Sequence, residues 1–258
     1  MNSNAIHSAS LAGFSVRTDS YVSGRPHYPP KTRDWLLAEL DLGPGKRVLD
    51  LGAGSGKFTQ PLAETRASVI AVEPSAAMRA AFTRRYPDLP CLAGTATSLP
   101  FTEGSFDAVA CGQSFHWFST AAALEEIRRV LKPGGTLALV WNVRDEEVPW
   151  VAALTDLVEP YAGDTPRFRD GTWRSLFPGH GFGPLREADC THSHSGPPAR
   201  VIRDRILSIS FIASLDEATR QQVAAGVQAI VDAEPELAGK AQVSFPYRTV
   251  MAWASAAR

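Results

Sequence analysis

The chain has 258 residues, of which 44% are hydrophobic and 21% are charged, and its formal net charge at pH 7 is −1. This length and composition predict one large globular domain, or one domain with an elaborated cap. Because the net charge is near zero and no basic stretch is interleaved with aromatic residues, we expect neither a nucleic acid nor an anionic membrane as partner.

The spacing of the cysteines and the composition of the N-terminus indicate the cellular compartment in which we expect the protein. Cys91, Cys111 and Cys190 are widely spaced and form neither a disulfide framework nor a Cys-x-x-Cys pair. Residues 1–20 are polar and lack the apolar core of a signal peptide, and no run long enough to span a membrane follows. We therefore expect a cytoplasmic protein, and the sequence leaves its oligomeric state open.

Three segments are predicted along the chain. Residues 1–30 form an N-terminal segment that is polar at first and rich in proline at its end, and we expect it to be partly flexible. Residues 31–142 form the predicted core. Residues 143–258 form a helical cap together with closing strands of the same fold.

Short apolar strands alternate with helices through the predicted core. The expected strands cover 47–51, 68–73, 91–94, 106–113 and 136–141, and the expected helices cover 32–40, 57–64, 75–86 and 121–131, with a turn at 132–135. This alternation predicts an α/β fold whose sheet is mostly parallel, with helices on both faces.

The pattern changes after Asn142. Mostly helical segments are expected over 149–161, 172–177, 199–215 and 215–232, with strands near 185–194 and 240–254. No linker separates this half of the chain from the first, so we expect it to cap the same fold.

A glycine-rich loop directly follows the first strand and is the strongest functional signal in the chain. Gly52, Gly54 and Gly56 stand at alternate positions, which lets the backbone turn sharply and pass close to a ligand. A strand, such a loop and a helix bind nucleotide-like ligands in open α/β sheets. A dinucleotide loop would need a glycine at position 57, which is Lys57 here, so the spacing disfavours a nicotinamide cofactor.

Glu73 ends the second strand, about twenty residues beyond the glycines. At the carboxyl end of that strand its carboxylate is placed to accept hydrogen bonds from a ribose diol. The plainer alternative is a solvated carboxylate that precedes the next helix.

Several motifs occur together in the order typical of one enzyme family. They are Val48–Gly56, Ala71–Ser75, Leu99–Phe101 with Ser105–Asp107, and Arg129–Gly135. As a set, these motifs resemble the class I S-adenosylmethionine-dependent methyltransferases, and within them the small-molecule group called methyltransferase type 11. The resemblance implies a Rossmann-like sheet, S-adenosyl-L-methionine as cofactor and a small-molecule acceptor.

The resemblance also implies which residues contact the cofactor. They are Tyr21, Arg25, Asp50, Gly52, Ala53, Gly54, Glu73, Pro74, Thr95, Ala96 and Gln113. Asp50 and Gly52 match contacts to the methionine amino group and backbone, and Glu73 matches the ribose carboxylate. Pro74 lies beside the adenine position, and Gln113 borders the methionine moiety. Tyr21 and Arg25 belong to a segment similar to one that folds over the cofactor.

One motif departs from the family pattern. After the third strand the family has Gly-Asp-Ala, whose aspartate accepts from the adenine amino group, whereas this chain has Gly94-Thr95-Ala96. A threonine hydroxyl is a weaker acceptor than a carboxylate. The Thr95 hydroxyl, the Ala96 N–H and another side chain therefore all stay open as partners of the adenine.

The histidines and arginines outside these motifs each have a functional and a structural interpretation. His116 follows the fourth strand in an aromatic stretch, where it is a general base or a pocket residue, or, as the plainer alternative, a polar neighbour of aromatic residues that pack the loop. His192 and His194 would face one way on a strand but have no third ligand, so we expect no metal site. Arg167, Arg169 and Arg174 are expected to be solvated, with recognition of a carboxylate-bearing acceptor as the alternative.

These observations together predict a methyltransferase that moves the methyl group by in-line displacement, and we expect an oxygen acceptor. Positioning the two reactants and excluding water supply most of the acceleration in such a reaction. The alternatives are a non-catalytic S-adenosylmethionine-binding protein and, less favoured, a nicotinamide-dependent oxidoreductase.

Overall fold

The structure is a computed structural model that describes residues 25–257. Tyr21 and most of the predicted N-terminal segment lie outside the described residues.

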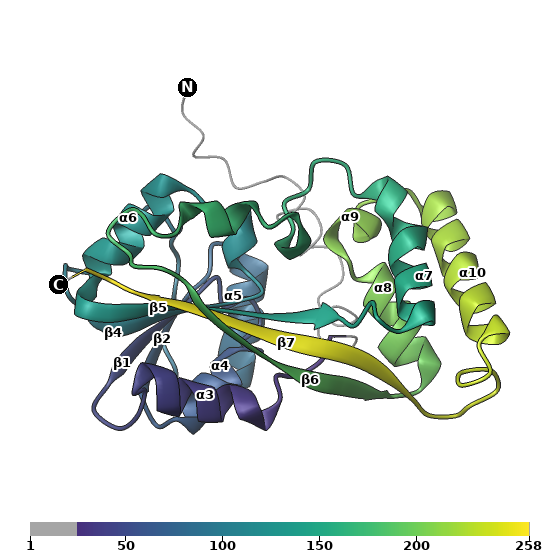
Figure 1. Ribbon diagram of the computed structural model, residues 1–258, viewed down its shortest axis with the longest axis horizontal. Helices are drawn as coiled ribbons and strands as arrows, with labels where there is room; N and C mark the ends of the chain where they lie inside the picture. Colours follow the sequence, from purple (N-terminus) through teal and green to yellow (C-terminus); the bar gives the residue numbers. More distant parts are fainter. Residues whose placement is uncertain (1–24, 258) are drawn as a thin grey trace.

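Within residues 25–257, seven strands form one sheet in the order β3-β2-β1-β4-β5-β7-β6 (Figure 1). The strands are β1 (Arg47–Leu51), β2 (Ser68–Val72), β3 (Cys91–Leu92), β4 (Phe106–Gly112), β5 (Leu131–Arg144), β6 (Arg186–Gly196) and β7 (Val243–Ser255). β1 to β5 pair in parallel, whereas β7 runs antiparallel to β5 and to β6. The predicted α/β fold with a mostly parallel sheet is confirmed.

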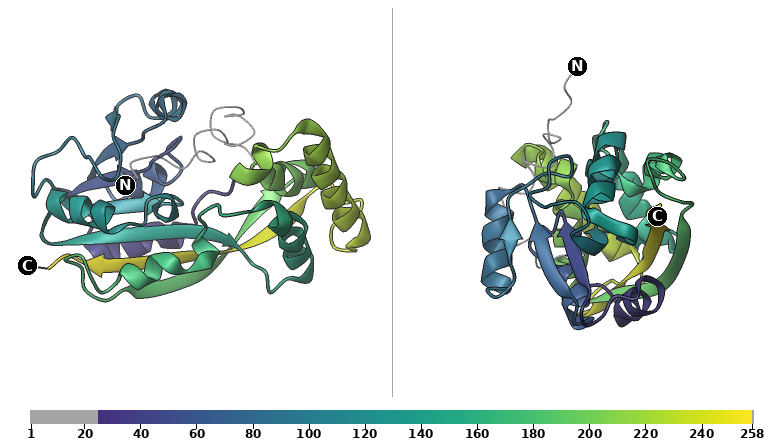
Figure 2. Two further views of the ribbon diagram at one scale, coloured as in Figure 1. Left: turned by 90° about the horizontal axis from the view of Figure 1, so that it is seen from above. Right: turned by 90° about the vertical axis from the view of Figure 1, so that its left-hand side faces the viewer.

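Helices lie on both faces of this sheet, as Figure 2 shows in its end-on view. The α-helices are α3 (Pro30–Leu40), α4 (Thr59–Glu64), α5 (Ala76–Arg85), α6 (Ala121–Val130), α7 (Pro149–Val158), α8 (Arg205–Leu207), α9 (Ser210–Ala213) and α10 (Glu217–Ala233). Short 3-10 segments are η1 (Phe115–Trp117), η2 (Glu159–Tyr161), η3 (Phe168–Asp170) and η4 (Thr172–Leu176), and η5 (Ala199–Asp204) is a π-helical turn.

Each face of the sheet has its own helical cover because successive strand residues point to opposite sides. On one face Trp35 of α3 and Leu62 of α4 pack with Val140 of β5. On the other face Leu124 and Ile127 of α6 pack in the cluster that holds the neighbouring strand residue, Leu139. The sheet is therefore shielded from water on both sides, and its strand ends are left to form the site.

Helix α6 illustrates how the sequence specifies this packing. The Thr120 side chain accepts from the Ala123 N–H and caps the first turn. The buried residues Ala123, Leu124, Ile127 and Val130 then recur at the three- and four-residue spacing of one helix face.

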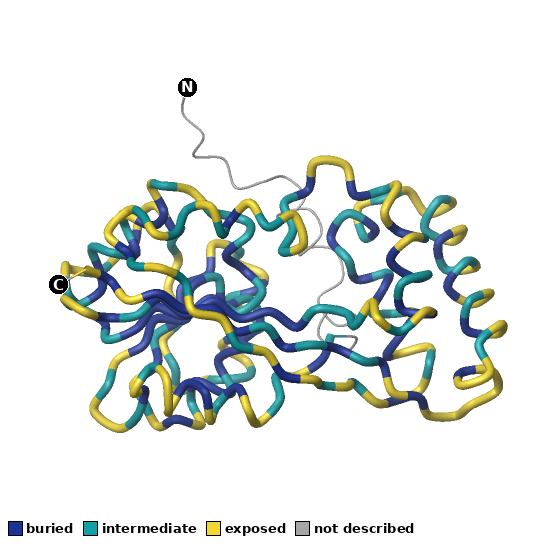
Figure 3. Tube along the Cα trace, viewed as in Figure 1, coloured by how far each residue is buried: buried dark blue, intermediate teal, exposed yellow. Residues whose placement is uncertain are grey.

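A second hydrophobic core holds the cap together. Trp150 and Leu154 of α7, Val223 and Val227 of α10, and Phe245 of β7 belong to one buried cluster. β5, β6 and β7 extend beyond the other strands and carry the cap helices (Figure 1). Buried residues, dark blue in Figure 3, are concentrated in the central strands and recur along the cap helices.

β5 differs from its prediction at both ends. It begins at Leu131, which pairs with Phe106, and the register then shifts before Thr136 pairs with Ala108. The predicted turn at 132–135 is therefore an irregular part of the strand, with Gly134 at a φ of 74°. The strand also continues to Arg144, so the predicted boundary after residue 142 falls inside it.

Two predicted helices also have different forms. The helix expected over 199–215 is divided into η5, α8 and α9, because Ile209 leaves the helical conformation with a ψ of 133°. The helix expected over 172–177 is the 3-10 segment η4. Within the described residues, none of the helices has the length and apolar character needed to cross a membrane.

Gly112 at the end of β4 packs closely against Phe58, the residue that precedes α4. A Cβ at position 112 would lie 2.3 Å from the Phe58 Cβ, and rotation of the ring cannot relieve this clash because Cβ is attached to the backbone. We expect Gly112→Ala to lower the free energy of unfolding by about 1–3 kcal/mol, measured by urea denaturation.

Gly43→Ala is the matched control, because a Cβ there would meet nothing within 4 Å. It should change the free energy of unfolding by less than about 1 kcal/mol. Equal stability of the two variants would contradict the close packing at Gly112.

Candidate active site

The parallel strands bring the predicted cofactor residues to one edge of the sheet. Leu51 at the end of β1 is in register with Val72 at the end of β2, and Val72 is in register with Leu92 at the end of β3. The glycine loop, Glu73 and the 94–97 turn follow these residues directly, so all three lie at the same edge.

The three alternating glycines adopt backbone conformations that other residues rarely take. The φ angles are 71° at Gly52, 57° at Gly54 and 82° at Gly56, all in the left-handed region that glycine enters without strain. A Cβ at Gly52 would also lie 2.7 Å from the Ser114 Cβ, whereas one at Gly54 would meet nothing within 4 Å. Gly54 therefore borders open space at the strand ends.

Glu73 ties the glycine loop to the start of α5. Its Oε2 accepts from the Gly54 N–H at 2.9 Å, and its Oε1 accepts from the Ser75 N–H at 2.8 Å. Burial raises the pKa of Glu73, against the lowering effect of these two bonds and of Arg79. The side chain is buried rather than solvated, and each carboxylate oxygen keeps a lone pair for a further donor.

Asp50 lies fully buried at the end of β1. Its Oδ2 accepts from the Thr59 hydroxyl at 2.6 Å, but its Oδ1 has no hydrogen-bond partner among the described residues. Burial, and to a smaller extent the charge of Glu73, raises the pKa of Asp50 to about 7 against the effect of the Thr59 bond. A cationic ligand group would supply the missing partner and stabilise the carboxylate.

The loop after β4 is fixed to its neighbouring strands. Gln113 has a φ of 59°, and its Nε2 donates to the Asn142 carbonyl of β5 at 2.8 Å. The Ser114 hydroxyl donates to the Leu51 carbonyl of β1 at 2.7 Å. A non-glycine residue held in this conformation is typical of functional loops, and Gln113 lies where the sequence predicts the methionine moiety.

The remaining predicted adenine contacts, Thr95, Ala96 and Pro74, follow β3 and β2 and differ in exposure. Thr95 and Ser98 exchange backbone hydrogen bonds of 3.4 and 3.1 Å and close a tight turn. The Ala96 side chain is buried, while Pro74 is exposed and its carbonyl accepts from Arg79. Ala53, by contrast, is buried in the loop and donates to the Val72 carbonyl at 3.2 Å.

Residues 25–28 connect the glycine loop, β5 and the cap. The Arg25 carbonyl accepts from Lys57 Nζ at 2.6 Å, and the Arg25 guanidinium donates to the Ser208 carbonyl at 3.2 Å. The His27 carbonyl accepts from the Asn142 amide at 3.2 Å. Burial, with the charge of Arg25, lowers the pKa of Lys57 to about 7.

A cavity of about 890 Å³ lies between the ends of β4 and β5 and the cap. Its lining includes Arg25, Gln113, His116, Arg144, Phe168, Arg205, Ile209 and Phe211, together with the three arginines singled out in the sequence, Arg167, Arg169 and Arg174. Gln113 therefore belongs both to the predicted cofactor edge and to the cavity.

His116 is held as a neutral ring at this cavity. Its Nδ1 accepts from the Trp141 indole N–H at 3.2 Å, and because an indole can only donate, the neutral ring carries its proton on Nε2. Burial, together with the charge of Arg25, lowers the pKa of His116 to about 3.

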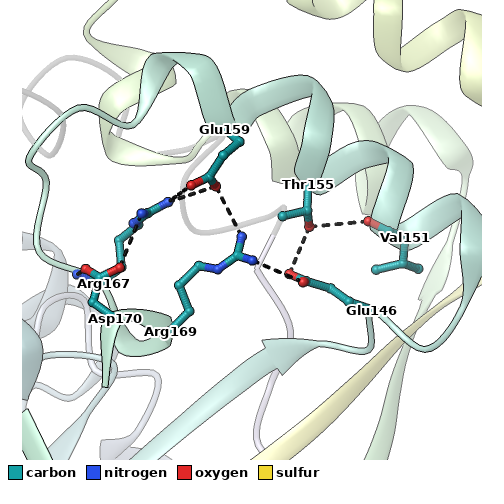
Figure 4. Close-up of polar contacts among 7 residues, drawn as sticks. All are labelled: Glu146, Val151, Thr155, Glu159, Arg167, Arg169 and Asp170. Atoms are coloured by element: carbon teal, nitrogen blue, oxygen red, sulfur yellow. Dashed lines mark hydrogen bonds and ion pairs between the residues drawn. The ribbon is translucent and has the colours of Figure 1, made fainter. Parts of the chain in front are cut away.

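The three arginines singled out in the sequence are paired with carboxylates. Arg167 and Arg169 lie 2.9 and 3.1 Å from Glu159 (Figure 4), and Arg174 lies 2.8 Å from Glu187. Their charges are neutralised by surface ion pairs, which favours the solvated reading over recognition of an acceptor.

Sequence reasoning missed Arg144 and Arg205, which line the same cavity. Arg144 ends β5. Gln113 is predicted because ligands bind beyond the carboxyl ends of parallel strands. The same reasoning would have indicated Arg144 if the predicted strand had continued past Trp141. Arg205 lies in the divided helical stretch, where no spacing in the sequence indicates its neighbours.

The His192 and His194 pair does lie on one face of β6, opposite Tyr247 and Phe245 of β7. In the part of the chain that the structure describes, no group of three or more His, Cys, Asp or Glu residues is placed to hold a metal ion.

Comparison with known proteins agrees with this geometry. A family model described as a methyltransferase domain matches residues 49–139. An uncharacterized methyltransferase-like protein of Schizosaccharomyces pombe is 37% identical over 241 residues, which cover 93% of this chain and 94% of the relative.

Solved structures share the fold. A protein of Anaeromyxobacter dehalogenans described as a type II methyltransferase has a TM-score of 0.64 and 23% identity, covering 91% of this chain and 97% of that one. The phosphoethanolamine N-methyltransferase 2 of Haemonchus contortus was solved with phosphomonomethylethanolamine and S-adenosylhomocysteine. It has a TM-score of 0.52 and 17% identity, and the match covers 88% of this chain and 52% of that one.

The S. pombe relative matches nearly the whole chain, and the sheet, the loop glycines and the acidic strand ends have the arrangement that the motifs imply. This chain belongs to the class I S-adenosylmethionine-dependent methyltransferases.

Proposed function

We propose that this protein transfers the methyl group of S-adenosyl-L-methionine to a small molecule bound in the cavity between the sheet and the cap. The observation that carries the proposal is the convergence of the glycine loop, Glu73 and Asp50 at one sheet edge, with Gln113 linking that edge to the cavity. S-adenosylhomocysteine in the structural neighbour from H. contortus supports the choice of cofactor.

The residues at the sheet edge fit this cofactor. The remaining lone pairs of Glu73 would accept from the ribose hydroxyls, and the unpartnered Oδ1 of Asp50 would accept from the methionine ammonium. The glycine loop gives a ligand close access to the backbone. When bound, the cofactor supplies a methyl group on a sulfonium, which is a good leaving group.

The protein contributes position and a water-poor environment. Gln113, whose side chain donates to the Asn142 carbonyl at 2.8 Å, would stand between the bound cofactor and the cavity. Residues 25–28 extend from the glycine loop to the cap and would cover the bound cofactor. Holding donor and acceptor in reacting geometry is worth on the order of 7–11 kcal/mol in favourable cases.

For the acceptor we propose an oxygen atom, with His116 as a pocket residue rather than a general base. A general base works best when its pKa lies near the operating pH, and the pKa of His116 is lowered to about 3. Its Nε2–H is instead a neutral hydrogen-bond donor. The acceptor oxygen must then react without His116 removing its proton.

We also propose that the protein works in the reducing cytoplasm, without a nucleic acid or membrane partner. The three cysteines are free thiols, and the net charge of −1 gives no electrostatic attraction to polyanions.

Loss of the Glu73 carboxylate should weaken cofactor binding. We expect Glu73→Ala to reduce the affinity for S-adenosylhomocysteine by about 1.5–3 kcal/mol, because charge-assisted hydrogen bonds to the ribose are lost. Isothermal titration calorimetry measures this change, and urea denaturation confirms that the variant folds.

Glu64→Ala, at an exposed carboxylate of α4, is the control and should keep the wild-type affinity. Unchanged binding in Glu73→Ala would remove the ribose assignment. Wild-type protein that binds NAD but not S-adenosylhomocysteine would contradict the proposed function.

Asp50 should make cofactor binding release protons. In the free protein Asp50 is half protonated near pH 7, and a bound ammonium would favour its charged form. Affinity for S-adenosylhomocysteine should therefore fall as the pH falls below about 7. Calorimetry at pH 6 in buffers of different ionisation enthalpy should detect the released proton.

Asp50→Asn should bind more weakly and release no proton at pH 6. Equal proton release in wild type and Asp50→Asn would show that another group faces the ammonium.

His116 should make stability depend on pH. Its folded pKa of about 3 lies below the ordinary value of 6.5, so the unfolded state binds more protons between these values. The stability it contributes is present above pH 6.5 and is lost as the pH falls toward 3. We expect His116→Gln to reduce the loss of unfolding free energy between pH 6.5 and 4.5 by about 1–3 kcal/mol.

Urea denaturation at a series of pH values measures this slope. His180→Gln, at an exposed histidine, is the control and should leave the slope unchanged. If the unfolding free energy of His116→Gln depended on pH as steeply as that of the wild type, the His116 ring would not be held neutral in the folded protein.

A further inference from the structure

Two arginines of the cavity lining form no ion pair with a carboxylate of the described residues, unlike Arg167, Arg169 and Arg174 of the same lining. Arg144 ends β5, and Arg205 begins α8. Nη1 of Arg144 and both Nε and Nη1 of Arg205 are buried and have no hydrogen-bond partner among the described residues. Five guanidinium donors normally find acceptors, so these orphaned donors need an explanation.

The surroundings of Arg144 do not neutralise it. Burial, together with the charge of Arg205, lowers the pKa of Arg144 to about 10. The nearby carboxylate of Glu146 is already engaged, because it accepts from the Thr155 hydroxyl at 3.0 Å and lies 3.6 Å from Arg169 (Figure 4). The buried Tyr247 hydroxyl is placed to accept from Arg205, but it is uncharged and neutralises neither guanidinium.

Two like charges held together without a counterion destabilise a folded protein. An arrangement of this kind is typical of a site whose counterion arrives as a ligand. Arg144 and Arg205 come from different elements, a strand end and a cap helix, and both line the cavity in which the acceptor is proposed to bind.

We propose that Arg144 and Arg205 bind an anionic group of the methyl acceptor, either a carboxylate or a phosphate. This inference rests on the proposed methyltransferase function and specifies the chemical class of its substrate. The planar guanidinium presents paired donors that match both kinds of anion. Phe168, Ile209 and Phe211 give the same cavity apolar walls, so the acceptor combines an anionic group with an apolar body.

An anionic acceptor also agrees with the neutral state of His116. If the reacting oxygen belongs to the anionic group, one of its lone pairs forms the new O–C bond while the C–S electron pair returns to sulfur. The products are a methyl ester and an uncharged thioether, and no proton has to be removed.

The test uses whole protein saturated with S-adenosylhomocysteine and three probes of similar shape. Benzoate and phenyl phosphate carry the two anionic groups, and benzamide is the uncharged counterpart. We expect at least one of the anions to bind at least about tenfold more tightly than benzamide in calorimetry at low salt. Arg144→Gln and Arg205→Gln should each remove this preference while benzamide and S-adenosylhomocysteine bind as before.

Arg203→Gln is the matched control. Arg203 lies two residues before Arg205, but it is exposed and sits 3.5 Å from Asp204, so its loss should not change the affinity for either anion.

Thermal unfolding of the free protein gives a second readout that needs no ligand. Arg144→Gln removes one of two neighbouring cations whose buried guanidinium nitrogens have no hydrogen-bond partner among the described residues, so its Tm should equal or exceed that of the wild type. A purely structural role for Arg144 would lower the Tm instead.

Failure of the two proposals can be told apart. Wild-type protein that does not bind S-adenosylhomocysteine contradicts the proposed function. If S-adenosylhomocysteine binds but neither anion is preferred over benzamide, or if the variants keep the preference, the inference on the acceptor is overturned alone. Weaker S-adenosylhomocysteine binding in both variants would assign the arginines to the cofactor carboxylate and would also overturn it.

Discussion

The parallel pairing of β1, β2 and β4 is the constraint on which the site depends. Strands that run the same way end at the same edge, so loops far apart in the sequence meet there. Helices on both faces keep the sheet dry, which leaves this edge as the place where backbone N–H groups and carboxylates face a ligand. The Glu73 carboxylate uses this position to bridge the glycine loop and α5.

The long strands β5 and β7 couple this edge to the cap. Asn142 of β5 is the centre of the connection: its Oδ1 accepts from the Thr249 hydroxyl at 2.6 Å and its Nδ2 donates to the His27 carbonyl at 3.2 Å. Its own carbonyl accepts from Gln113. One amide in the sheet thus joins residues 25–28, β7 and the loop after β4, which lies between the proposed cofactor edge and the cavity. A satisfied buried network of this kind fixes the relative positions of its members.

Charge is distributed unevenly across the proposed site. Asp50 and Glu73 place buried carboxylates on the side of the glycine loop, whereas Arg144 and Arg205 place cations that form no ion pair with the described residues on the side of the cap. The proposed cofactor is cationic at its sulfonium and ammonium, and the proposed acceptor is anionic. The two carboxylates would attract the ammonium of the cofactor and the two arginines the anionic group of the acceptor, which would orient the two reactants before they meet.

The local sequence determined the features that depend on neighbouring residues. Alternate glycines after an apolar strand demand a left-handed loop, and strand endings place Glu73 and Gln113, because backbone conformation and side-chain alternation are local properties. Tertiary structure alone decided the protonation of His116, which depends on Trp141 and Arg25. It also decided the meeting of Arg144 with Arg205, because burial and unpaired charge arise only when a strand end and a cap helix are brought together across the sheet.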